Sequence, residues 1–289
     1  MMTRFGFALL WLLHFLPLPV LAGFGNGLGF LLYILAAERR MVAHTNLRLC
    51  FPEMSQRERT RLVRRNFMAF GRSLVERSIL WWASGERIKS LVQIKGLEHY
   101  QAVEKGPVIL LAPHFVALDV GGSWLSQYGD MFSVYSNQKN PVFHAKLLEG
   151  RSRFGNQLLI SRQQGLRPVV KALRKGLSFY YLPDQDLSIK DALFIPFFGV
   201  PAATLNTVSR LVEMTGARVV PIVTRMLPHG QGYELQFYPA WENYPTGDDV
   251  ADTRRMNEFI EQRVLEIPEQ YFWLHKRFKT RPEGEKRFY

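Results

Sequence analysis

The feature that most constrains this chain is the regular alternation of short apolar runs with helical segments after residue 107. The runs of strand length are PVILLAP, MFSVYS, LLIS, LSFYYLP, ARVVPIVTRM and YELQFYPA. The helical segments lie near residues 115–127, 142–153, 166–175, 204–215 and 251–266. Strands that alternate with helices form sheets whose faces the helices cover, so we predict a single α/β domain with a mixed, largely parallel sheet. Ligands of such sheets bind beyond the carboxyl ends of the strands.

The N-terminal segment has no formal charge between Arg4 and Glu38, a stretch of 33 residues. About 20 apolar residues suffice to cross a bilayer, whereas one straight helix over this stretch would be roughly 50 Å long. Pro17, Pro19 and the glycines between residues 23 and 29 offer places to break it. Two arrangements are therefore compatible with the sequence: one tilted hydrophobic helix, or two shorter helices on or in the membrane. We predict a hydrophobic membrane anchor over residues 1–38.

Two other interpretations of this segment are weaker. Residues 1–4 form a weakly basic start and Val20-Leu21-Ala22 resembles a signal-peptide cleavage site, but the apolar run continues for 15 residues beyond Ala22. The glycines of GFGNGLG follow no strand, which favours close helix packing over a dinucleotide-binding loop.

Positive charge dominates the chain, whose formal net charge is +12. This charge predicts an anionic partner, which could be nucleic acid, lipid headgroups or a phosphorylated substrate. The sequence has no Walker loop, zinc-finger pair or RNP motif, so lipid phosphate is favoured and no nucleic-acid partner is predicted. Residues 39–77 hold ten arginines against three glutamates. The positive-inside rule therefore places the rest of the chain in the cytoplasm.

A long helix is predicted over SQRERTRLVRRNFMAFGRSLVERSILWW, where Ser55 and Glu58 have capping-box spacing. Its apolar stripe consists of Leu62, Val63, Phe67, Phe70, Leu74 and Trp81. Its other faces carry Arg57, Arg61, Arg64, Arg65 and Arg72. These arginines either form a solvated face or contact anionic headgroups, and the upstream anchor favours headgroups. The basic residues of the tail either contact anionic partners as well or only solubilise it: Lys276, Arg277, Lys279, Arg281, Lys286 and Arg287.

The strongest candidates for catalysis are His114 and Asp119, where PVILLAP ends. Histidine titrates near neutrality, so its imidazole can take a proton from a hydroxyl that attacks a carbonyl. A neighbouring carboxylate fixes the tautomer and stabilises the imidazolium. We expect His114 at the strand end and Asp119 in the first turn of the next helix, where the two side chains can meet.

Four further residues are predicted to bind substrate near this pair. PDQDL follows the strand LSFYYLP and brings Asp184 and Asp186 to the same sheet edge, while EGRSR supplies Arg151 and Arg153 ahead of another strand. The alternatives are a polar turn for the aspartates and helix-end contacts for the arginines. No other histidine or carboxylate lies at ligand spacing beside the pair, so we predict no metal and no cofactor.

The sequence offers no evident protein nucleophile. There is no G-x-S-x-G elbow, which weakens a serine-hydrolase interpretation. Cys50 is the only cysteine, so no intramolecular disulfide can form. It lies in LRLCFPE without a strand-to-helix turn, and we expect a small packed hydrophobe. A histidine base without a nucleophile indicates direct transfer, in which an acceptor hydroxyl attacks an activated acyl group.

Several sequence blocks, in order along the chain, resemble the late acyltransferases of lipid A biosynthesis. HFVALD matches the H-x4-D/E motif of the wider glycerolipid acyltransferase superfamily. The narrower resemblance rests on NLRLCFPEMSQRER, NQKNPVF, EGRSR, PDQDLS, FIPFFGVPAAT, GARVVPIVTR and PEQYFWLHKRFKTRP. In this resemblance His114 takes the general-base position and Asp119 the acidic position, where many members have glutamate. In the same resemblance, Arg151 and Asp184 match two further positions that are functional in such enzymes.

The resemblance implies an acyltransferase domain over residues 39–289, at the cytoplasmic face of a Gram-negative inner membrane. It implies transfer from acyl carrier protein to a hydroxyl of a Kdo-bearing lipid A precursor. Both partners are acidic, which suits the net charge. A related enzyme that acylates another membrane lipid, such as ornithine lipid or mannosylated phosphoinositide, is the alternative. Two functions other than acyl transfer also stay open: a non-catalytic lipid-binding scaffold and a lipid hydrolase.

Overall fold

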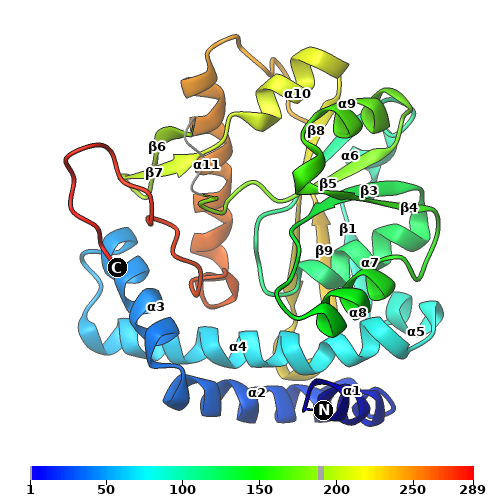
Figure 1. The fold of residues 1–289 in the computed structure, drawn as a ribbon, viewed down its shortest axis with the longest axis vertical. Coiled ribbons are helices and arrows are strands. Elements are labelled where there is room, and N and C mark those ends of the chain that lie inside the picture. Colours follow the sequence, from blue (N-terminus) through cyan, green and yellow to red (C-terminus); the bar gives the residue numbers. More distant parts are fainter. Residues whose placement is uncertain (1, 188–191) are drawn as a thin grey trace.

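The computed structural model describes residues 2–187 and 192–289. Its centre is a seven-stranded sheet of order β1-β9-β8-β2-β5-β3-β4 (Figure 1). The strands are β1 (Val92–Lys95), β2 (Val108–Leu111), β3 (Met131–Tyr135), β4 (Gln157–Ser161), β5 (Ser178–Tyr181), β8 (Arg218–Met226) and β9 (Tyr233–Phe237). Neighbours in this sheet are parallel except for the antiparallel pair β8 and β9. The predicted α/β class and the largely parallel sheet are confirmed.

The six predicted strands are all present, but three others were not predicted. β1 is a short edge strand whose burial alternates, so it lacks a continuous apolar run. β6 (Leu193–Phe197) and β7 (Val200–Thr204) form a separate antiparallel pair in which Pro196 lies opposite Pro201. Proline cannot donate to a ladder, so it usually argues against a strand, except in a ribbon with open edges such as this one.

Helices cover both faces of the sheet. The predicted segments after residue 107 become α7 (Leu118–Tyr128), α8 (Pro141–Arg151), α9 (Arg167–Arg174), α10 (Thr207–Thr215) and α11 (Asp249–Glu266). The short helices α5 (Gly85–Ser90) and α6 (Leu97–Gln101) flank β1. Ile109 and Leu111 of β2 pack in one apolar cluster and Val108 and Leu110 in the other. Both faces of the central strand are therefore buried, as expected of a parallel sheet.

Helix α4 (Gln56–Trp82) crosses beneath the sheet and joins both clusters. The predicted capping box is confirmed, because Ser55 Oγ accepts from the Glu58 amide and the Glu58 carboxylate accepts from the Ser55 amide. Arg72 does not belong to the exposed basic face. It is buried, and its Nε lies 2.6 Å from Glu76 Oε1. A buried charge of this kind needs a partner, which explains the pairing.

The C-terminal tail packs on the protein more closely than a solubilising end would. Arg277 is buried and donates to the Ala203 carbonyl and the Thr204 hydroxyl, both at 2.8 Å. Lys276 lies 3.0 Å from Glu38. Arg277 is therefore unavailable as an exposed contact for an anionic partner, while Lys279, Lys286 and Arg287 are exposed.

The N-terminal segment forms two apolar helices, α1 (Met2–Leu13) and α2 (Leu18–Leu35), followed by α3 (Ala37–Cys50). The break lies at Pro17, and the Arg87 guanidinium donates to the carbonyls of His14 and Leu16 there. Of the two predicted possibilities, the structure has the pair of shorter helices rather than one continuous helix. Helix α2 is long and apolar enough to cross a membrane, by length and composition.

Two glycines of α2, Gly25 and Gly29, are packing residues. An added Cβ at Gly29 would lie 2.3 Å from the Phe67 carbonyl oxygen, and one at Gly25 would lie 2.5 Å from the Cα of Arg72. Gly71 of α4 faces the same contact. The prediction of close helix packing is confirmed for Gly25 and Gly29, whereas an added Cβ at Gly23 or Gly27 would meet nothing within 4 Å. Helix α2 lies along α4 (Figure 1).

We expect Gly29→Ala to destabilise the protein, because the new methyl group meets the backbone of α4. Overpacking of this kind costs about 1–3 kcal/mol. Gly27→Ala is the matched control, since a Cβ there meets nothing within 4 Å and alanine is the better helix former. Thermal unfolding of both variants in detergent checks this, and an equal or higher midpoint for Gly29→Ala would contradict the close contact.

Candidate active site

The register of two parallel strands brings a histidine and an aspartate together. Leu111 of β2 pairs with Tyr181 of β5. Three residues beyond these partners, each chain segment reaches a polar side chain that follows a proline, His114 in one and Asp184 in the other. Because the strands run in the same direction, both side chains emerge at the carboxyl edge of the sheet. His114 Nδ1 and Asp184 Oδ1 lie 2.6 Å apart.

The Asp184 carboxylate is buried and multiply hydrogen-bonded. Only 1 % of its side chain is exposed, against 17 % for His114. It accepts from the backbone amide of His114 at 3.1 Å and from the Tyr271 hydroxyl. Burial alone would raise the pKa of this carboxyl, but the charge of His114 and these hydrogen bonds outweigh it and lower the pKa to about 2. Asp184 therefore stays ionised and holds the imidazole by Nδ1, which leaves Nε2 for a substrate.

Asp119 does not contact the imidazole in the way the sequence predicted. It lies in the first turn of α7, as expected, but its carboxylate pairs with two arginines. Arg77 Nη2 of α4 lies 2.5 Å from Oδ2, and Arg151 Nη2 at the end of α8 lies 3.4 Å from Oδ1. Burial opposes ionisation, but Arg77 and Arg151 lower the pKa of Asp119 below its ordinary value. The expected contact between His114 and Asp119 is thus replaced by one between His114 and Asp184.

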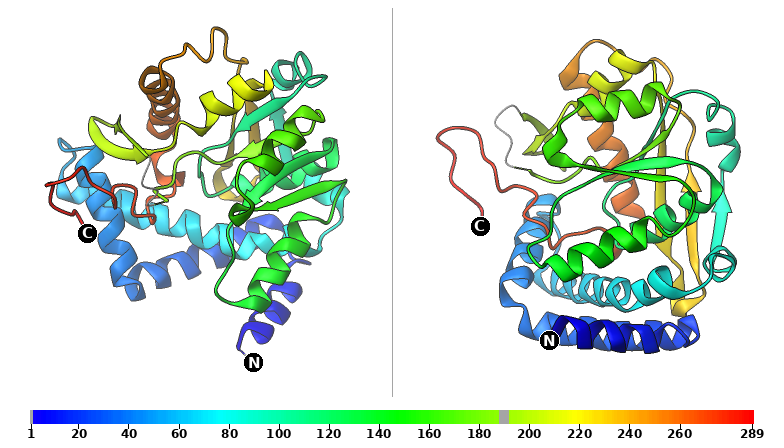
Figure 2. Two further views of the ribbon diagram at one scale, coloured as in Figure 1. Left: turned by 45° about the horizontal axis from the view of Figure 1, so that its top comes forward. Right: turned by 45° about the vertical axis from the view of Figure 1, so that its right-hand side comes forward.

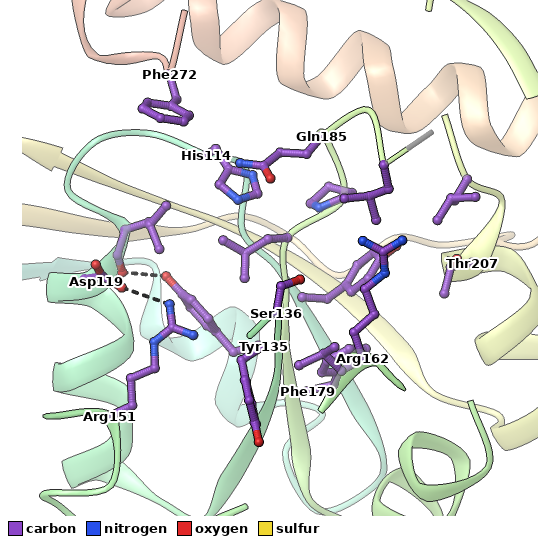
Figure 3. A pocket seen from close by; sticks show the side chains of 18 of the residues that line it. His114, Asp119, Tyr135, Ser136, Arg151, Arg162, Phe179, Gln185, Thr207 and Phe272 are labelled. Atoms are coloured by element: carbon purple, nitrogen blue, oxygen red, sulfur yellow. Dashed lines mark hydrogen bonds and ion pairs between the residues drawn. The ribbon is translucent and has the colours of Figure 1, made fainter. Parts of the chain in front are cut away.

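A cavity of about 590 Å³ is lined by His114, Arg77, Asp119 and Arg151. Figure 3 shows His114 at its wall, with Asp119 and Arg151 on one side and Arg162 and Thr207 on the other. Its apolar lining includes Phe70, Leu118, Leu147, Val169, Phe179 and Leu182. Cavities of this size and apolar character with a few polar groups are typical of small-molecule sites.

The chain is similar to known proteins over nearly its whole length. The family described as bacterial lipid A biosynthesis acyltransferase matches residues 1–280. The chain is 37% identical to a lipid A biosynthesis lauroyltransferase of Escherichia coli K12, over 98% of this chain and 93% of that one. It is 34% identical to a palmitoleoyltransferase of the same pathway and organism, over 100% and 94% of the two chains. A myristoyltransferase from this strain is 35% identical over 92% and 82%.

The chain belongs to the bacterial lipid A biosynthesis acyltransferase family. The resemblance found in the sequence is thereby confirmed, and the protein is an acyltransferase.

In this acyltransferase, the other predicted substrate-binding residues divide into two groups. Arg151 lines the cavity. Arg153 does not, because its guanidinium donates to the carbonyls of Leu80 and Ala83 at 2.5 and 2.7 Å, where α4 ends. The structure therefore agrees with the alternative prediction for Arg153, a contact at a helix end.

Asp186 does not line the cavity of the acyltransferase either. It is buried and accepts hydrogen bonds from the amide and hydroxyl of Thr280, at 2.6 and 2.9 Å. Its own amide donates to His275 Nε2 at 3.0 Å. Asp186 therefore fixes the C-terminal segment beside the site, and the predicted role in substrate binding has no support from its position. Cys50 is buried, as expected.

Three residues at the site were not predicted. Arg77 lies 42 residues before its partner Asp119, inside a helix rich in arginine. Tyr271 and His275 come from the C-terminal segment. This segment is attached to the site by the Phe272 amide, which donates to the His114 carbonyl at 2.9 Å. Burial lowers the pKa of His275 to about 4, and the charges of His114 and Arg277 act in the same direction. His275 is therefore neutral beside the ionised Asp184.

The Asp184 pKa predicts how stability depends on pH. The folded-state pKa of about 2 lies below the ordinary value of 3.8. The ionised carboxylate therefore stabilises the fold fully above pH 3.8, and this contribution is lost as pH falls through the folded value. We expect the difference in unfolding free energy between wild type and Asp184→Asn to shrink as pH falls from 3.8 to about 2. The exposed Glu283→Gln is the control, and a difference that stays constant for Asp184→Asn would contradict the low pKa.

Proposed function

We propose that this acyltransferase moves a fatty acyl chain from the thioester of acyl carrier protein to a hydroxyl on an acyl chain of a Kdo-bearing lipid A precursor. One observation supports this most: His114 lines an apolar cavity while its Nδ1 is held by the buried Asp184. This is the arrangement that a general base needs, because the tautomer is fixed and Nε2 has a free lone pair. The cavity also matches a fatty chain in character.

The reaction follows in two steps. His114 Nε2 removes the proton of the acceptor hydroxyl as its oxygen attacks the thioester carbonyl, and Asp184 stabilises the imidazolium that forms. The tetrahedral intermediate then collapses, the carbon–sulfur bond breaks, and the imidazolium returns its proton to the phosphopantetheine thiolate. The products are the new ester and the free carrier thiol, and the imidazole is neutral again.

Asp119 has a different role in this mechanism. Its carboxylate lies between Arg77 and Arg151 and therefore fixes both guanidinium groups at the cavity wall. Two guanidinium groups against one carboxylate leave a net positive charge there. We propose that Arg151 donates to the oxyanion of the intermediate or to a phosphate of the acceptor, and that Asp119 positions it.

The apolar N-terminal helices suit an enzyme with a lipid acceptor. Large exposed hydrophobic side chains concentrate on α1, α2 and the turn between them: Leu9, Trp11, Leu12, Phe15, Phe24, Phe30, Leu31, Ile34 and Leu35. Apolar surface of this extent marks an interaction site. We propose that residues 1–38 anchor the enzyme at the inner membrane, with residues 39–289 on the cytoplasmic side. The exposed Arg57, Arg61 and Arg64 then add attraction to anionic lipid.

Three single substitutions test the assignment of roles. We expect His114→Ala and Asp184→Asn each to lower the turnover number by about 100- to 10,000-fold, since one removes the base and the other its orientation. Asp119→Asn leaves the imidazole contact intact, so we expect it to act mainly by loosening Arg151. The measurement is transfer of labelled acyl chain from acyl carrier protein to the lipid A precursor, with the product identified by mass spectrometry.

A folded His114→Ala variant with near-normal transfer would contradict the general-base role. Release of free fatty acid without acylated precursor in the wild type would instead indicate a hydrolase. Circular dichroism of each variant separates loss of chemistry from loss of fold.

A further inference from the structure

A strongly basic ridge borders the cavity on the side away from Asp119. The ridge runs over residues 162–175, through a short 3-10 turn and helix α9, and contains five cations and no acidic residue. Its members are all exposed: Arg162, Arg167, Lys171, Arg174 and Lys175. None of them pairs with a carboxylate among the residues that the structure describes. A concentration of one sign of charge creates a surface potential that attracts partners of the opposite charge.

Apolar side chains lie beside the charged side chains of the ridge. A shallow hollow of about 510 Å³ lies between α9 and α10. It is lined by Leu166, Val170 and Met214 together with the basic side chains of the ridge other than Arg162. Leu166 and Met214 are each 38% exposed. Apolar contacts framed by charge are the usual composition of a protein-docking surface. A phosphate ion or a sugar headgroup would need only the charge.

The hollow lies next to the active cavity. Leu166 lines both of them, and Arg162, Gly165 and Arg210 form the neighbouring part of the cavity rim. Figure 3 shows Arg162 beside Thr207, across the cavity from Arg151. A flexible arm that enters beside Leu166 therefore reaches the same space as His114.

The ridge faces away from the apolar helices. In Figure 1 and in the right-hand view of Figure 2, α9 and α10 lie at one end of the molecule and α1 and α2 at the other. If α1 and α2 contact the bilayer, the ridge points into the aqueous phase. Its partner is then a soluble molecule rather than a lipid headgroup.

We propose that the ridge and the hollow dock the acidic acyl carrier protein, whose acyl-phosphopantetheine arm enters the cavity past Leu166. This inference rests on the proposed function, which names the carrier as donor. Complementary charge steers the two proteins together and makes the encounter depend on salt. Donor and acceptor then approach His114 from opposite ends of one cavity, the carrier at α9 and the lipid at α4 and α8.

The test reverses charge on the ridge without touching the cavity. Arg167→Glu/Lys171→Glu changes two exposed side chains that do not line the active cavity. We expect the KM for acyl carrier protein to rise at least about 10-fold, with kcat within about twofold of wild type and a weaker dependence of KM on salt. With a small donor, the acyl-phosphopantetheine thioester, the variant should match wild type, because no docking is needed.

The control is Lys89→Glu/Lys105→Glu, which makes the same charge change at exposed positions outside the ridge. An unchanged carrier KM in the ridge variant, or an equal rise in the control, would overturn the docking site. A ridge variant that loses binding to anionic vesicles while its carrier KM is unchanged would overturn it in favour of a headgroup contact. Failure of the wild type to use acyl carrier protein at all would refute the proposed function itself.

Discussion

The site depends on one buried carboxylate. Asp184 accepts from the ring and the amide of His114, and from Tyr271 of the C-terminal segment. The charge of the imidazole and these hydrogen bonds outweigh burial and hold the Asp184 pKa at about 2. Such a group is costly to bury unless every acceptor is used. The same requirement holds β2, β5 and the chain end in one arrangement, so the contact that orients the base also fixes the geometry around it.

Around this contact the molecule has two different ends. The apolar α2 packs through Gly25 and Gly29 on α4, which also supplies Arg77 to the cavity. At the other end, α9 presents a basic ridge beside an apolar hollow. The cavity at the carboxyl ends of the strands is lined by Phe70, Ser73 and Arg77 of α4 and by Arg162 and Leu166 of the ridge. In the mechanism we propose, the lipid acceptor and the charged donor both reach His114 in this cavity.

The edge of the sheet that holds the site could be predicted from the sequence, but the carboxylate that pairs with His114 could not. PVILLAPH and SFYYLPD both show a strand, a proline and a polar residue, so His114 and Asp184 could be placed at one edge. Asp119 reaches the same edge, and nothing local decides which carboxylate meets the imidazole. The decision comes from Arg77 and Tyr271, which lie far away in the sequence and bind one acid each. The β6–β7 ribbon was not predicted, because Pro196 and Pro201 cannot donate to a strand ladder and are more typical of loops.

The most direct test of the central contact is nitrogen-15 NMR of the His114 ring, assigned with His114→Gln. For the neutral imidazole we predict a protonated Nδ1 that donates to a carboxylate and an unprotonated Nε2. We expect this pattern to persist in Asp119→Asn and to be lost in Asp184→Asn. The opposite outcome, in which the pattern is lost in Asp119→Asn and kept in Asp184→Asn, would contradict the assignment of Asp184 as the partner of the base.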